Sequence, residues 1–187
     1  MIAVIGEMGI SFRPCEDLWS KGFSGLGYDW VVKLRNEGLD TLLLTVLPFG
    51  KSGEEISEEL VRLKAVFDPD MMEHMNPLVE INGEWLMKSS SVTAMSTEKL
   101  TSAFSYFSDI KSVVISSALL SYNPSSSAVL DSVSFMFPQP KVAIDTGCSE
   151  SAVGNKDMLE RTLSLFSSAC PDVLITDDKE RILDFIR

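Results

Sequence analysis

The chain has 187 residues, of which 45% are hydrophobic and 23% charged, and this is enough to form one ordinary globular domain. Its longest apolar runs are too short to cross a bilayer, so we expect no membrane partner. The net charge of −11 argues against a nucleic-acid partner, because an acidic surface repels phosphate backbones. Three dispersed cysteines favour a reducing, cytoplasmic setting, and the single histidine, His74, excludes a mechanism that needs a histidine pair.

The pattern of apolar residues and turn formers predicts alternating strands and helices from the start of the chain. Continuous apolar runs after residues 2 and 41 are typical of buried strands, whereas the apolar spacing from Tyr28 onward is helical. Gly38 then stands where a helix C-cap belongs. The expected elements are a strand at 2–6, short strands or loop at 8–24, a helix at 28–37, a strand at 41–47, a turn at 50–53 and a helix at 54–63.

The rest of the chain continues this alternation, apart from one hairpin. Asn82-Gly83 separates two β-type runs at 78–81 and 85–88, and we expect this hairpin to lie off the main sheet. The remaining expected elements are helices at 97–107, 125–135 and 156–168, strands at 112–116, 141–145 and 172–176, and a helix-like tail at 179–187. Strands that alternate with helices predict a mostly parallel sheet with right-handed crossovers.

The residues that follow the predicted strands are candidates for a binding site, because open parallel sheets bind ligands beyond the C-terminal ends of their strands. These positions are Glu7, 48–51, 116–118, 145–149 and 176–180, and their residue types are acidic and small. Such residues suit a hydroxyl-rich ligand or a cation. Acids and glycines at strand ends also form turns, so composition alone leaves both interpretations open.

Several segments, taken in order, resemble the ribokinase / phosphofructokinase-B (PfkB) family of carbohydrate kinases over essentially the whole chain. The opening IAVIGEMGISF resembles the family's first strand and the entry into its substrate lid, and SGLGYDWVVKLRNEG resembles its signature GGxxxNxAxxLxxLG. TLLLTVLPFGKSG is similar to the following strand and turn, and the NG hairpin falls where the family has lid strands. VAIDTG resembles a strand ending in DxNxR, and DVLITDDKE resembles DILxPNxxE.

The resemblance implies one α/β domain over residues 1–187, with a ribokinase-like three-layer αβα fold and a mostly parallel central sheet. It also implies a small β lid at about 8–24 and 76–90, and the C-terminal part of the family's fold is missing. The implied family activity is ATP-dependent phosphorylation of a sugar hydroxyl, with Mg²⁺ and ATP as cofactors and a sugar or nucleoside as the ligand. The implied site residues are Glu7, Ser11, Gly25, Asp29 and Asp145 for the substrate, and Asp177 and Glu180 for the metal.

The chain departs from the family pattern at positions that would hold the sugar and the nucleotide. Ser11 and Gly50 stand where the family has Asp, and Asp29 and Asp177 stand where it has Asn. The family's catalytic base lies in a GAGD segment, and no Gly-Asp dipeptide occurs in the 187 residues. We therefore predict no catalytic residue here and no kinase activity from this chain alone, since phosphoryl transfer depends on that base and on charge stabilisation.

Two other interpretations stay open. KVAIDTGCS also resembles an aspartic protease signature, in which Asp145-Thr146-Gly147 would pair across a twofold axis, although those enzymes are all-β. The other is a non-catalytic sugar-binding, nucleoside-binding or interaction protein, with a homodimer formed through an open sheet edge or the lid hairpin. We expect His74 to be a loop residue over an apolar patch and Trp30 to be core. Trp85, on the hairpin, could cover a sugar ring or pack in a dimer, and packing is the favoured interpretation.

Overall fold

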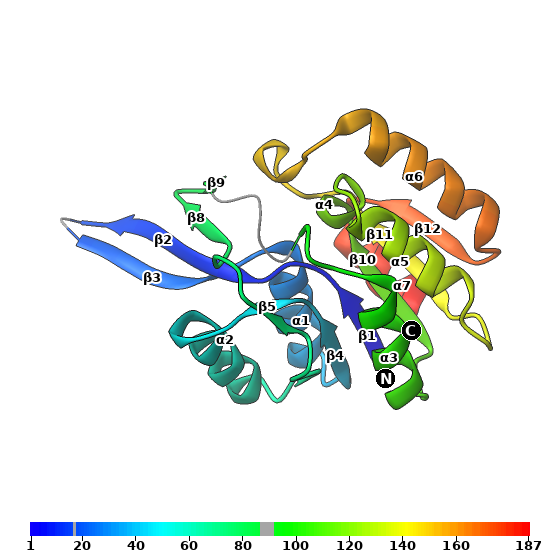
Figure 1. Ribbon diagram of the computed structural model, residues 1–187, viewed down its shortest axis with the longest axis horizontal. Helices are drawn as coiled ribbons and strands as arrows, with labels where there is room; N and C mark the ends of the chain where they lie inside the picture. Colours follow the sequence, from blue (N-terminus) through cyan, green and yellow to red (C-terminus); the bar gives the residue numbers. More distant parts are fainter. Residues whose placement is uncertain (17, 87–91) are drawn as a thin grey trace.

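The computed structural model, which describes residues 1–16, 18–86 and 92–187, has an α/β body from which a second β sheet projects (Figure 1). Its strands are β1 (Ile2–Ile5), β2 (Gly9–Cys15), β3 (Leu18–Ser24), β4 (Thr41–Leu44), β5 (Leu47–Pro48), β6 (Val66–Phe67), β7 (Met72–Glu73), β8 (Val79–Ile81), β9 (Glu84–Trp85), β10 (Ser112–Ser116), β11 (Lys141–Asp145) and β12 (Val173–Thr176). Its helices are α1 (Leu26–Asn36), α2 (Lys51–Arg62), α3 (Thr97–Tyr106), α4 (Ser117–Leu120), α5 (Ser125–Ser134), α6 (Lys156–Ala169) and α7 (Lys179–Ile186), with a 3₁₀ helix, η1 (Glu150–Ala152).

The central sheet has six strands in the order β12-β11-β10-β1-β4-β6, and every pair is parallel. The pairing sets Val4 of β1 beside Leu43 of β4 on one side and Val114 of β10 on the other. Strands that are buried on both faces carry continuous apolar runs, which is why IAVI, TLLL and SVVIS lie at the centre of the sheet. The predicted parallel sheet is confirmed.

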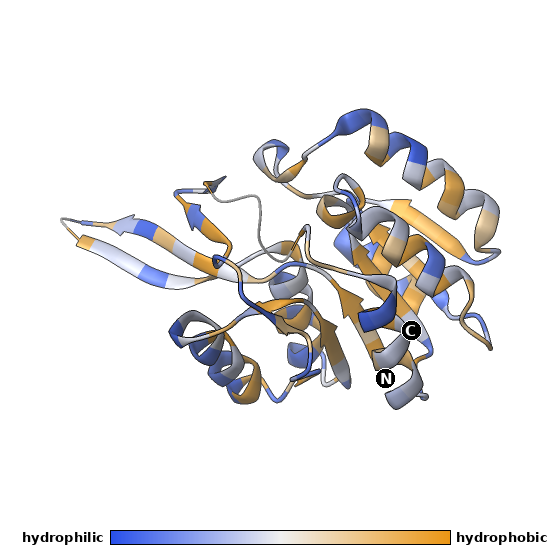
Figure 2. Ribbon diagram, in the orientation of Figure 1, coloured by the Kyte–Doolittle hydropathy of each residue, from blue (hydrophilic) through white to orange (hydrophobic). Residues whose placement is uncertain are grey.

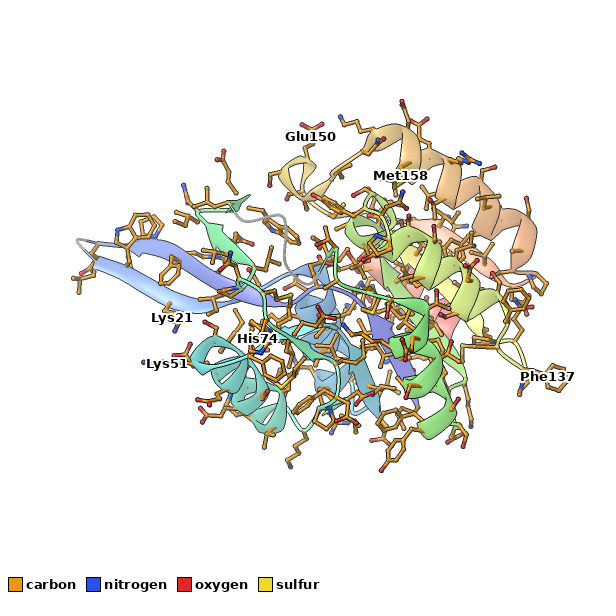
Figure 3. All side chains as sticks on the ribbon, viewed as in Figure 1. Lys21, Lys51, His74, Phe137, Glu150 and Met158 are labelled. Atoms are coloured by element: carbon orange, nitrogen blue, oxygen red, sulfur yellow. The ribbon has the colours of Figure 1, made fainter. Side chains whose placement is uncertain are left out.

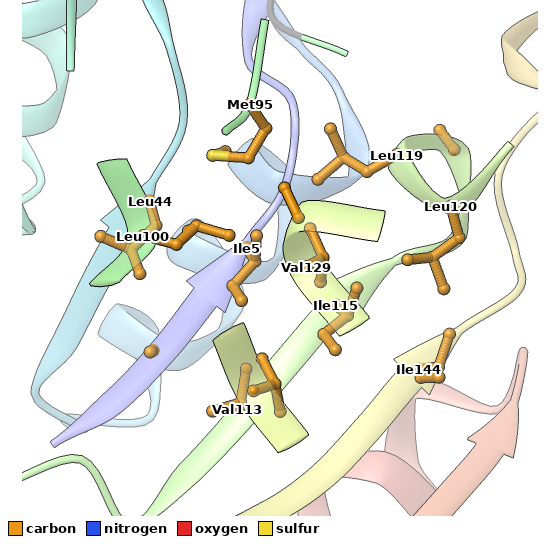
Figure 4. Packing of buried hydrophobic residues seen from close by; sticks show 14 of the residues in the cluster. Ile5, Leu44, Met95, Leu100, Val113, Ile115, Leu119, Leu120, Val129 and Ile144 are labelled. Atoms are coloured by element: carbon orange, nitrogen blue, oxygen red, sulfur yellow. The ribbon is translucent and has the colours of Figure 1, made fainter. Parts of the chain in front are cut away.

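Helices cover both faces of this sheet, which gives the body three layers. Residues such as Ile5 and Val113 pack on one face with Leu100 and Val129, in a cluster that includes α3, α4, α5 and α6 (Figure 4). Val4 and its neighbours on the opposite face pack against α1, α2 and α7. Figure 2 shows the apolar residues along the strands and the polar ones on the outer surfaces of the helices. In the described part of the chain, no helix is long and apolar enough to cross a membrane.

The second sheet takes its strands from two separate segments, in the order β3-β2-β8-β9. β8 and β9 are antiparallel and joined by Asn82 and Gly83, whose φ angles of 50° and 87° fit the tight turn that an Asn-Gly pair favours. The predicted hairpin is therefore confirmed off the main sheet, although its expected end at 87–88 lies outside the described residues. The β2–β3 hairpin extends away from the body and exposes Leu18 and Trp19.

The structure corrects the sequence-based interpretation of residues 41–53. The strand predicted at 41–47 is two strands, because β4 ends at Leu44 and β5 pairs with β7 in a small sheet of its own. The turn predicted at 50–53 is wrong, since α2 begins at Lys51. Gly50, with φ at 85°, reverses the chain directly before the helix, and the backbone of Gly53 then packs on that of Pro48.

Candidate functional site

The C-terminal ends of the parallel strands face the second sheet across a small cleft of about 120 Å³. Four segments contribute to it: the end of β1, the start of α1, the β8–β9 hairpin and the loop after β11. The lining residues are Glu7, Gly25, Leu26, Asp29, Glu80, Gly83, Trp85, Gly147, Cys148 and Ser149. The cleft therefore lies at the edge of the sheet where α/β folds bind ligands.

Glu7 lies at the floor of this cleft and is fully buried. Its Oε1 accepts the backbone N–H of Leu26 at 2.8 Å, a favourable contact because a helix N-terminus attracts negative charge. Its Oε2 is buried and has no hydrogen-bond partner in the structure. Burial raises the pKa of this carboxyl to about 7. The nearby Ser116 hydroxyl opposes this rise, although it does not form a hydrogen bond with Oε2.

Gly25 allows β1 and α1 to meet closely at this floor. Its φ of 112° is rarely adopted by other residues, and a Cβ at this position would lie 2.5 Å from the carbonyl oxygen of Glu7. Any larger residue would push the start of α1 away from β1. The glycine predicted to contact a substrate thus lines the cleft and also sets the position of Glu7.

Asp145, another predicted substrate contact, is buried at the end of β11 and is not among the residues that line the cleft. Its Oδ2 accepts the indole N–H of Trp30 at 2.7 Å, and its Oδ1 accepts the N–H of Gly147 at 2.7 Å. Burial raises the pKa of its carboxyl. Asp145 therefore positions the loop that carries Gly147 and Cys148, and Trp30 is a core residue, as predicted.

The other predicted substrate residues occupy different positions. Asp29, in the first turn of α1, lines the cleft and forms an ion pair with Lys179 at 3.6 Å. Ser11, on β2, is buried opposite Gly22 of β3 and does not line the cleft. The structure thus brings Glu7, Gly25 and Asp29 together at the cleft and leaves Ser11 outside it.

The sequence analysis missed Glu80 as a cleft residue, whereas Cys148 falls in the candidate range 145–149 and Trp85 was expected on the hairpin, where it could cover a ligand. Glu80 and Trp85 pair directly across the hairpin, so their side chains share one face of the second sheet. Counting outward from Asn82-Gly83 gives that pairing, and this was the available signal. Cys148 lies 3.1 Å, Sγ to Oγ, from Ser117, and burial raises the pKa of its thiol.

The predicted metal residues follow β12: Asp177 lies before α7 and Glu180 lies in the first turn of that helix. Glu180 is exposed and its Oε1 accepts a hydrogen bond from Lys33 Nζ at 2.6 Å. Asp177 lies near Gly147, where its charge contributes to the raised pKa of Asp145. Over residues 1–16, 18–86 and 92–187, no three acidic, cysteine or histidine side chains gather as a metal site would require. The metal assignment stays a prediction.

A larger groove of about 550 Å³ lies elsewhere, between α3, α5 and the segment after α5. Phe137, wholly exposed, projects from this segment (Figure 3). Among the described residues that line the groove, Asp131 is the only titratable one, and the others are apolar or carry hydroxyl groups. His74 does not line the small cleft either, and its ring packs on Phe49 with 4.6 Å between the ring centroids. The smaller cleft is the better candidate because charged and polar groups converge there.

Comparison with known proteins gives a consistent result for the fold. No family model and no curated protein matches the sequence. An uncharacterized sugar kinase from Pyrococcus horikoshii is 18% identical with a TM-score of 0.72, over 94% of this chain and 64% of that one. Aminoimidazole riboside kinase from Salmonella enterica, complexed with aminoimidazole riboside and an ATP analog, is 16% identical with a TM-score of 0.73, over 90% and 57%.

A PfkB family carbohydrate kinase from Listeria grayi is 15% identical with a TM-score of 0.69, over 98% of this chain and 62% of that one. The chain thus spans less than two thirds of the length of each of these three structures. Likeness at such low identity establishes the fold. The fold class predicted from the sequence is confirmed: the chain has the ribokinase-like fold of the PfkB sugar kinases.

Proposed function

We propose that this chain binds a sugar or nucleoside in the cleft at the strand ends, as the substrate-side part of a PfkB-type carbohydrate kinase. The observation that carries the proposal is Glu7, a buried carboxyl with one unpaired oxygen at the floor of the cleft. An unpaired buried acceptor is costly, and a ligand hydroxyl would satisfy it. The riboside in the Salmonella enterica structure supports this ligand class.

The dimensions and walls of the cleft also suit such a ligand. Its volume of about 120 Å³ is well below the roughly 300–1,000 Å³ typical of sites for drug-sized molecules, so we expect it to enclose the sugar ring alone, of a free sugar or of a nucleoside. Trp85 offers an apolar surface on one side, while Asp29 and Glu80 offer hydrogen-bond acceptors. An apolar wall combined with a few polar groups is the usual composition of a small-molecule site.

We propose further that these residues bind the ligand without transferring a phosphoryl group to it. No Gly-Asp dipeptide is present to supply the base of the family's GAGD segment. Asp177 and Glu180 have the carboxylate oxygens that Mg²⁺ prefers, and proteins commonly hold Mg²⁺ with one or two carboxylates together with substrate phosphates. Glu180 is paired with Lys33, and no third acid joins them in the described part of the chain. The binding of Mg²⁺ and ATP is implied only by the family resemblance.

A thermal-shift panel of sugars and nucleosides, each with and without Mg²⁺-ATP, tests the proposal. A ligand at 100 times its Kd stabilises the native state by about 2.7 kcal/mol, which raises the Tm of a chain of this size by roughly 5–10 °C. We expect such a shift with at least one sugar or nucleoside and none with ATP alone. Ser149→Arg, at the cleft, should abolish the shift, and Ser102→Arg, exposed on α3, should retain it. The absence of any sugar or nucleoside shift would contradict the proposal.

Exposed apolar side chains on the β2–β3 hairpin favour a second candidate, a dimeric interaction protein. Leu18 is 76% exposed and Trp19 is 59% exposed. We propose that two copies pair through this hairpin, because exposed apolar residues on a projecting strand pair are costly in water. Light scattering should then give twice the chain mass of 20.6 kDa, and Trp19→Ser should give the single mass. A wild-type protein at the single mass would rule out this dimer.

A further inference from the structure

The charges around the cleft are unevenly compensated. Its lining contains three carboxyl groups, and no Lys, Arg or His is among its described residues. Asp29 is paired with Lys179 and Glu80 with Arg13, each at 3.6 Å. No cation pairs with Glu7 in the described part of the chain. When Glu7 is ionised, its charge is therefore the uncompensated one at the floor of the site.

The groups near Glu7 do not supply the missing positive charge. The Asp29 carboxyl on α1 and the Cys148 thiol after β11 line the cleft with it, and the Ser116 hydroxyl and the Tyr122 phenol lie near enough to influence or respond to its charge. Each of these is either negative or neutral. The N-terminus of α1 already donates the Leu26 N–H to Glu7 Oε1, and no side-chain cation among the described lining residues is left to attract a second anion, in a buried position where charge interactions are stronger than in water.

We propose that Glu7 determines specificity in this cleft, so that the site accepts neutral polyols or nucleosides and their amino-bearing analogues and rejects sugar acids. This inference rests on the proposed function, since it names the substrate class of the same site. A hydroxyl or ammonium group can donate a hydrogen bond to the free Glu7 Oε2. A carboxylate placed there offers no donor and meets a like charge, which discriminates against it.

The test is isothermal titration calorimetry at pH 8 with matched probes: ribose and ribonate, then glucose, gluconate and glucosamine. We expect each neutral sugar to bind at least about tenfold more tightly than its acid, and glucosamine to bind at least as tightly as glucose. Glu7→Gln keeps the shape and an acceptor for the Leu26 N–H but removes the charge, so it should bring the ratio of neutral to acid affinity to about one. Glu160→Gln, an exposed position on α6 that does not line the cleft, removes a carboxylate elsewhere and should change this ratio less than about threefold.

The pH dependence supplies a readout that a merely structural role for Glu7 would not produce. Because burial raises the pKa of Glu7 to about 7, the discrimination against acids should shrink at pH 6 in the wild type and stay constant in Glu7→Gln. A sugar acid that binds the wild type as tightly as its neutral partner would overturn the inference and leave the proposed function standing. A Glu7→Gln variant that keeps the wild-type ratio would do the same. If no sugar or nucleoside binds, both the proposed function and this inference are overturned.

Discussion

Glu7→Gln is expected to stabilise the protein at pH 8 and to have a much smaller effect at pH 5. Burial raises the pKa of Glu7 from 4.5 to about 7, so the folded state holds a proton that the unfolded chain releases. The free energy of unfolding therefore falls as pH rises through this window and is lowest above pH 7. At about 1.36 kcal/mol per pKa unit, the wild type loses about 3 kcal/mol by pH 8 and less than about 1 kcal/mol by pH 5.

A glutamine is neutral at every pH, so the variant avoids this loss. Urea denaturation of both proteins from pH 5 to pH 8 measures the difference, with Glu160→Gln, an exposed position on α6, as the control for simple removal of a carboxylate. A wild-type stability that does not decline over this range more than that of Glu7→Gln would show that Glu7 is not a buried, proton-binding carboxyl.

Gly53→Ala is expected to cost more than about 4 kcal/mol of stability. A Cβ on Gly53 would lie 1.8 Å from the carbonyl oxygen of Pro48, which belongs to β5 and cannot move as a flexible side chain could. The alanine must therefore displace the first turn of α2 or break the pairing of β5 with β7. Costs of this size arise when a substitution disrupts the packing of the backbone itself.

Gly50→Ala is the matched control for this substitution. Gly50 lies three residues earlier with φ at 85°, and a Cβ there meets nothing within 4 Å. Its substitution should cost only the backbone penalty for φ at 85° and ψ at −162°, a conformation that glycine alone adopts readily, which is about 1–3 kcal/mol. Chemical denaturation compares the two variants directly. Equal stabilities for Gly50→Ala and Gly53→Ala would refute the close packing of α2 on β5.

The main features of the fold could be predicted because they depend on local patterns. Continuous apolar runs identified the parallel strands, and Asn82-Gly83 identified the hairpin with its turn. The break between β4 and β5 could not be predicted, because TLLLTVLPF is apolar throughout and no period marks the point where one strand ends. The start of α2 was missed for a related reason: Gly50 in a left-handed conformation can precede a helix as readily as it forms a turn.

The site was predicted less completely because it depends on contacts between distant segments. Glu7 and Gly25 could be named from the end of the first strand and the signature after it. Asp145 followed the same rule, but the hydrogen bond from Trp30, 115 residues earlier, occupies one of its oxygens. Glu80 and Trp85 reach the cleft only because the second sheet folds back over the strand ends, which no local pattern reveals.

The cleft at the strand ends is expected to bind a sugar or nucleoside. Amide chemical-shift mapping by NMR, with the ligand that gives the largest thermal shift, locates the bound molecule. We expect the perturbed amides to cluster at Glu7, at Gly25 and in the loop of residues 147–149, with little change in Ser149→Arg. Perturbations confined to the groove between α3 and α5, or none at saturating ligand, would contradict it.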